Sequence, residues 1–159
     1  MTRESRSVRE ALQDPEGFAR CRSSLDAAIE DSCESGAPWP ARVVAAIRAA
    51  VEFAEADRVA ALVITGHAAH RRSTHTPAFA AMVGRWAARL GEGAPPTRHP
   101  QRTATAVVQR IARQILLQLE LRPEVPPTHI AGDLIVFALT PYLGFVEALR
   151  WAEEEGPDP

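Results

Sequence analysis

The sequence predicts an all-α domain, and three observations support this prediction. Apolar side chains recur at steps of three and four residues along most of the chain, which is the spacing of one face of an α-helix. The apolar residues are chiefly Ala, Val and Leu, and alanine is the strongest intrinsic helix former. No two segments share the alternating pattern of paired strands. The 159 residues fit a single domain.

We expect a polar tail at residues 1–13, one helical domain at 14–155 and a short tail at 156–159. Asp14 and Pro15 are typical of a helix start, since Asp is a good N-cap and Pro is favoured at the first helical position. Gly36 is expected to close this first helix.

Trp39 stands between two prolines, which indicates a stiff elbow before an amphipathic helix that includes Val43 and Ala54. Asp57 is expected to cap a further helix over residues 58–66. The β-branched residues of that segment favour a strand, but no partner strand exists, so we predict a helix. Residues 66–76 are polar and are expected to form a loop or a fraying helix end.

Thr76 and Pro77 indicate the start of the next helix, and residues 91–100 are rich in Gly and Pro and predict a linker. The most apolar stretch, residues 101–151, predicts two long helices separated by residues 123–127. Pro141 is expected to end or kink the second long helix around Thr140, because proline lacks a backbone N–H group. A last short helix is expected over residues 145–155.

The two long helices are apolar nearly all round, and such a helix must be covered on more than one side. We expect the chain's own core to cover one side and a second copy of the chain to cover the other. The alternative is a monomer that buries the same side chains internally. The residues predicted at the dimer interface are Ala104, Val108, Ile111, Ile115, Leu119, Ile130, Leu134 and Phe137.

Composition argues against several classes of function. The net charge is −2 and the Arg residues are interspersed with acids, so no basic face for direct nucleic-acid binding is expected. No apolar run reaches the roughly 18 residues of a membrane span, and the first residues are charged and lack the apolar core of a signal peptide, so we expect a cytoplasmic protein. Cys21 and Cys33 are expected in one helix about 18 Å apart, too far for a disulfide.

His67, His70 and His75 form the densest group of metal-capable side chains. No Cys or acid lies among them and two Arg residues follow His70, so a solvated surface is preferred to a metal site. Asp133 is interpreted as an acid in the first turn of a helix. No nucleophile, phosphate-loop or metalloprotease motif is found. We therefore expect neither an enzyme nor a cofactor.

Three segments resemble the C-terminal regulatory domain of TetR-family transcription regulators. Residues 39–53 (WPARVVAAIRAAVEF) are similar to the family's W-P-x-R-V helix. Residues 104–116 (ATAVVQRIARQIL) stand where the family has its first dimer helix, and residues 140–148 (TPYLGFVEA) are similar to a common P-Y/F-L-G ending. The resemblance covers nearly the whole chain and implies a helical bundle whose last two long helices form a four-helix dimer bundle.

The resemblance also implies a function. The chain is expected to bind a small hydrophobic or aromatic molecule and to form a homodimer, or a heterodimer with a full-length TetR-type regulator. The family begins with a helix-turn-helix domain, for which the residues before Asp14 leave no room, so no DNA binding of its own is expected. The alternatives are a repressor whose DNA-binding head is missing from this chain and a heterodimerisation partner that binds no ligand.

Segments similar to the family's pocket-forming helices supply the predicted pocket. Its apolar residues are Phe18, Leu25, Trp39, Phe53, Phe79, Met82 and Trp86. Thr65, His67 and His70 are expected to provide polar contacts. The alternative is that these side chains simply pack the core. As a group they favour an apolar or aromatic ligand over a charged one.

Overall fold

The computed structural model describes residues 15–69 and 76–154. This part of the chain forms seven α-helices and one short 3-10 helix, with no strand. The elements are α2 (Pro15–Ser32), α3 (Trp39–Ala56), α4 (Arg58–Ala69), α5 (Thr76–Gly91), α6 (Pro100–Leu121), η1 (Pro127–Ile130), α7 (Ala131–Leu143) and α8 (Phe145–Glu154). The predicted all-α fold is confirmed.

Two helix boundaries at the N-terminal end differ from expectation. Helix α3 begins at Trp39, inside the expected elbow, with Pro40 in its first turn, where the missing N–H group leaves no helical bond unmade. Helix α2 ends at Ser32, so Gly36 does not close it directly. Gly36 instead adopts a φ of 88° in the connection, a conformation that glycine tolerates best.

The start of α4 follows the prediction, but its end does not. The Asp57 carboxylate accepts a hydrogen bond from the Ala60 backbone N–H at 2.9 Å, which confirms the predicted cap. The helix then continues through Gly66 to Ala69. A helical glycine costs only about 1 kcal/mol relative to alanine, and the two alanines that follow His67 favour helix.

The predicted end of α7 at Thr140 is wrong by about one turn. The helix runs through Pro141 to Leu143 and ends at Gly144, which has a φ of 82°. Because Pro141 lies in the last turn, the loss of its N–H group removes little of the helical ladder. The Gly144 N–H donates to the Thr140 carbonyl at 3.0 Å and completes that ladder.

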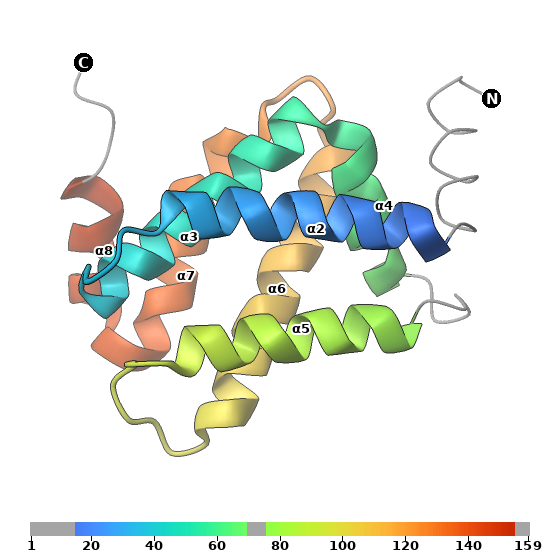
Figure 1. The fold of residues 1–159 in the computed structure, drawn as a ribbon. Coiled ribbons are helices and arrows are strands. Elements are labelled where there is room, and N and C mark those ends of the chain that lie inside the picture. The colour runs from blue at the N-terminus through green and yellow to red at the C-terminus, as the bar shows by residue number, and fades with distance from the viewer. Residues whose placement is uncertain (1–14, 70–75, 155–159) are drawn as a thin grey trace.

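Helix α6 joins the two halves of the core. It packs against α4, α5 and α7, and Figure 1 shows it passing behind α2 and α5. Val107, Ile115 and Leu119 belong to a hydrophobic cluster shared with α3, α7 and α8. Val108 and Ala112 pack instead against a second cluster, built from α2, α4 and α5. Helix α6 is therefore covered by its own chain on more than one face.

This packing bears on the residues predicted at a dimer interface. Ala104, Ile115, Leu119 and Leu134 are buried within the chain, and Val108, Ile111 and Ile130 are half-buried. Phe137 alone among the eight is largely accessible, with 41% of its surface exposed. The chain itself thus covers most of the surface that the sequence assigned to a second copy, while dimerisation stays a prediction.

The contrast between a buried and an exposed apolar side chain tests the packing. Leu119 of α6 is 1% exposed and Val146 of α8 is 67% exposed. We expect Leu119→Ala to lower the free energy of unfolding by about 2–5 kcal/mol because it leaves a cavity in the first hydrophobic cluster. Val146→Ala, the control, should change it by less than about 0.5 kcal/mol. Urea denaturation measures both, and equal effects would contradict the described burial of α6.

Candidate ligand-binding pocket

A pocket of about 460 Å³ opens between α2, α3, α5 and α6. This volume is in the range of sites for small organic molecules. Its lining is mainly apolar and is formed by Ile29, Trp39, Val43, Ala46, Ile47, Ala50, Trp86, Leu90, Val108, Ile111 and Ala112. The polar lining residues are Glu30, Cys33, Arg42, Arg89 and Glu92. An apolar cavity with a few charged groups is suited to binding a hydrophobic molecule in a defined orientation.

The Trp39 side chain is a fixed wall of the pocket. Its indole Nε1–H donates to the Leu90 backbone carbonyl at 2.7 Å, which ties the start of α3 to the end of α5. Its other neighbour is Tyr142 of α7, with ring centroids 4.9 Å apart and planes tilted by 59°. Burial raises the pKa of Tyr142 above its usual value. Because contacts on two sides fix the Trp39 side chain, it need not be reordered when a ligand packs on it.

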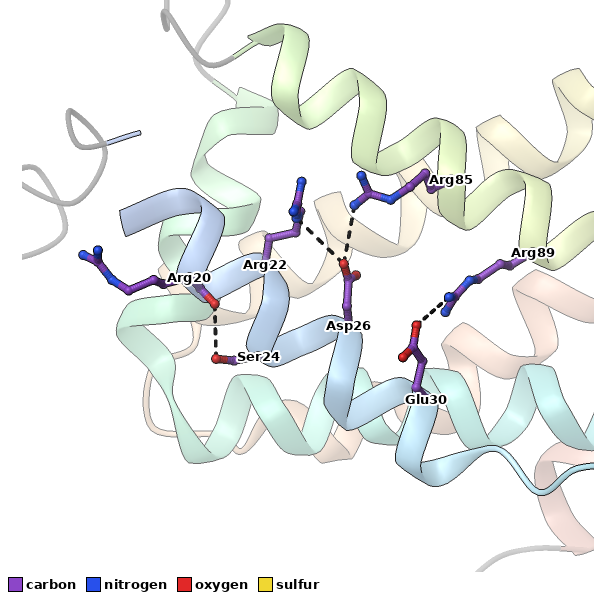
Figure 2. A network of polar contacts seen from close by, with 7 residues as sticks. All are labelled: Arg20, Arg22, Ser24, Asp26, Glu30, Arg85 and Arg89. Atoms are coloured by element: carbon purple, nitrogen blue, oxygen red, sulfur yellow. Dashed lines mark hydrogen bonds and ion pairs between the residues drawn. The ribbon is translucent and has the colours of Figure 1, made fainter. Parts of the chain in front are cut away.

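Two ion pairs connect α2 to α5 across one side of the pocket (Figure 2). Asp26 accepts from Arg85 at 3.4 Å, and Glu30 accepts from Arg89. Both pairs join residues 59 positions apart, so the two helices run parallel where they face each other. Arg22 also lies 3.8 Å from Asp26. Charged pairs therefore connect α2 and α5 at the pocket, in addition to the apolar contacts of the second hydrophobic cluster.

Arg89 links these ion pairs to the aromatic lining of the pocket. Its guanidinium lies 5.1 Å from the centre of the Trp86 ring, a cation–π distance. The hydrogen bond to Glu30 raises the pKa of Arg89, although burial acts in the opposite direction. Both partners of this pair are about half exposed, so the pair adds little to stability. The pair instead fixes the position of a side chain, because it holds the Arg89 guanidinium over the Trp86 ring.

Both cysteines are free thiols. Cys33 lines the pocket just beyond the end of α2, and its Sγ lies 3.8 Å from the Arg42 backbone carbonyl. Cys21 packs against the second hydrophobic cluster. Burial, and next the charge of Asp57, raise the pKa of Cys21. Its thiolate fraction at neutral pH is correspondingly low.

The structure places the residues of the predicted pocket in two different environments. Trp39 and Trp86 line the pocket. Phe18, Phe79 and Met82 are buried in the second hydrophobic cluster, and Leu25 and Phe53 pack against it. Thr65 is buried and donates its hydroxyl hydrogen bond to the Ala61 carbonyl at 2.7 Å. The His67 side chain, His70 and His75 lie outside the described residues.

Sequence reasoning missed most of the pocket lining. Val43 was predicted only as part of an amphipathic helix, and Ile47 and Ala50 follow the same helical spacing. Ile111 and Val108 were assigned to the dimer interface, yet both form part of the pocket. Periodicity identifies which face of a helix is covered, but it does not say whether a neighbour fills the space in front of that face.

Among residues 15–69 and 76–154, no group of three or more His, Cys, Asp and Glu residues is arranged to hold a metal ion. Within the same ranges, no helix combines the length and hydropathy needed to cross a bilayer. Asp133 is exposed in the first turn of α7, as the sequence predicts.

Comparison with protein-family models, with curated proteins and with solved structures finds no match for this chain. The resemblance to TetR-family regulatory domains therefore rests on the three sequence segments alone. By its structure, the protein is an all-helical domain with a pocket between four of its helices.

The anchoring of Trp39 can be tested by removing its hydrogen-bond donor. Trp39→Phe keeps an aromatic ring but leaves the Leu90 carbonyl without the indole N–H, and we expect it to lower the free energy of unfolding by about 1–3 kcal/mol. Trp151→Phe is the control, because Trp151 is half-buried in α8 away from the pocket. Thermal or urea unfolding compares them, and a larger loss for Trp151→Phe would contradict the anchoring role.

Proposed function

We propose that this domain binds a small, mainly apolar molecule in the pocket between α2, α3, α5 and α6, and serves as a regulatory domain similar to that of TetR-family proteins. The observation that carries the proposal is the pocket itself, about 460 Å³ with apolar walls and two tryptophans. An open pocket of this size with mainly apolar walls is typical of sites for small organic molecules. An apolar molecule of matching size would remove its own apolar surface and that of the pocket walls from water.

The resemblance noted in the sequence supports the same function. Trp39, Arg42 and Val43 of the W-P-x-R-V segment all line the pocket. The segment that carries the family resemblance is thus also the segment that shapes the cavity. The pocket walls offer mainly dispersion and aromatic contacts, which favour a hydrophobic or aromatic molecule.

A route by which ligand binding reaches the rest of the domain runs through α3. Trp39 faces the pocket and also contacts Tyr142 of α7. Helix α3 packs against both α7 and α8. A ligand that packs against Trp39 would therefore be connected to α7 through one shared side chain, and this contact is the element that we propose ligand binding biases.

Dimerisation is the second part of the proposal. Leu117, Leu121 and Ile130 line a shallow groove between α6 and α7, together with Asp133. Phe137 lies one turn beyond Asp133 on the same face of α7 and is exposed. This is the surface through which we propose that two copies associate, so a change in α7 would reach the partner.

Native mass spectrometry of the protein, incubated with an organic extract of cells, tests both parts. We expect a dimer that carries a reproducible added mass. Ala46→Trp places a large side chain in the pocket and should abolish the added mass. Ala88→Trp makes the same change at an exposed position of α5 and should retain it.

Three results would count against the proposal. Persistence of the added mass in Ala46→Trp would place the ligand outside the pocket, and its absence from the unaltered protein would remove the basis for ligand binding. A monomer under gentle conditions would contradict the dimer while leaving the pocket in place.

A further inference from the structure

The polar residues at the pocket are not equally satisfied. Glu30 and Arg89 pair with each other, so their charges are compensated. The Glu92 side chain is exposed, and solvent screens its charge. Arg42 differs from all three, because none of the ion pairs among the described residues includes it. It therefore contributes a half-buried positive charge that has no ion-pair partner among the described residues.

The guanidinium of Arg42 also has hydrogen-bonding capacity to spare. Within the described residues it makes one hydrogen bond, from Nη2–H to the Glu92 backbone carbonyl at 2.9 Å. Its Nε–H is shielded from solvent and has no acceptor. An unpaired donor that water cannot reach is unfavourable, typically by about 1–3 kcal/mol. The guanidinium N–H groups that make no hydrogen bond within the described residues can donate to an acceptor that enters the pocket.

The backbone around Arg42 fits this side chain closely. A Cβ atom added to Gly93 would lie 3.1 Å from Arg42 Nη2, and Gly93 has a φ of 79°, which side chains rarely adopt. The connection between α5 and α6 therefore approaches the guanidinium as only glycine allows. The hydrogen bond to the Glu92 carbonyl holds the guanidinium beside this connection, and Arg42 and Glu92 both line the pocket.

From these observations we infer that the ligand is an apolar carboxylic acid, with its carboxylate bound by Arg42 and its apolar body against Trp39 and Trp86. This inference rests on the proposed function of the pocket and adds the chemical class of the ligand. A planar guanidinium with free N–H groups matches a carboxylate better than any neutral acceptor, because both charge and geometry are complementary. The aromatic lining selects an aromatic or otherwise bulky apolar body.

Naphthaleneacetic acid and naphthaleneacetamide are suitable probes, since they share a ring system and size and differ in a head group that is a charged carboxylate in one and a neutral amide in the other. Isothermal titration calorimetry at neutral pH gives the affinity ratio of acid to amide for each variant. We expect the acid to bind the unaltered protein roughly ten- to a hundredfold more tightly than the amide, the range for a charged hydrogen bond. Arg42→Gln should reduce this ratio to about one by weakening only the acid.

Arg48→Gln is the matched control, because it removes the same charge from the same helix at a residue that does not line the pocket. It should keep the ratio of the unaltered protein. Continued binding of the amide by Arg42→Gln shows that this variant is folded with its pocket intact.

The outcomes separate the two proposals. Equal binding of acid and amide by the unaltered protein, or a ratio that survives in Arg42→Gln, overturns the acid inference and leaves the pocket function standing. Binding of neither compound at millimolar concentration overturns both, because two tryptophan walls should then have held at least the shared ring system.

Discussion

The burial of α6 by its own chain is the constraint on which the rest of the structure depends. This helix contributes Val107, Ile115 and Leu119 to one hydrophobic cluster, while Val108 and Ala112 pack on the other. Two clusters that share one helix cannot shift independently, because any rotation of α6 exposes apolar surface on one side. At roughly 25 cal/mol for each Å² of apolar surface exposed, that rotation is unfavourable. Helix α6 therefore fixes where α3, α5 and α7 lie.

The pocket follows from the same arrangement. Helices α3 and α6 form its inner wall through Ile47 and Ile111, while α2 and α5 face each other at its outer side. Charged residues, such as Glu30 and Arg89, connect those outer helices across the pocket. Exposed ion pairs separate at little cost, whereas the shared apolar core of α6 does not. The inner wall is thus part of the shared core, whereas α2 and α5 are joined at the pocket by exposed ion pairs as well as by the second cluster.

Sequence patterns predicted the helices well because each buries one continuous face, and the cap at Asp57 was readable from residue type alone. They misplaced the ends of α4 and α7, since glycine and proline near a last turn disturb few hydrogen bonds. The pocket was harder to predict. Trp39 and Trp86 stood out as aromatic residues, but Val43 of the pocket has the same helical periodicity as the residues buried in the second hydrophobic cluster, so the two could not be told apart. Whether a buried face meets a side chain or a cavity depends on packing between segments distant in sequence. The position of Arg42 beside Gly93 likewise depends on such packing and could not be predicted from the sequence.

The central claim is that an apolar molecule binds between Trp39 and Trp86, and the three tryptophans of this chain allow a direct test. The measurement is a titration of isotope-labelled protein with naphthaleneacetic acid, followed through the indole N–H resonances by NMR. The account predicts that the Trp39 and Trp86 resonances shift together and saturate at one concentration, while the Trp151 resonance in α8 stays in place. A shift of Trp151 alone, or no shift of the other two, would contradict it.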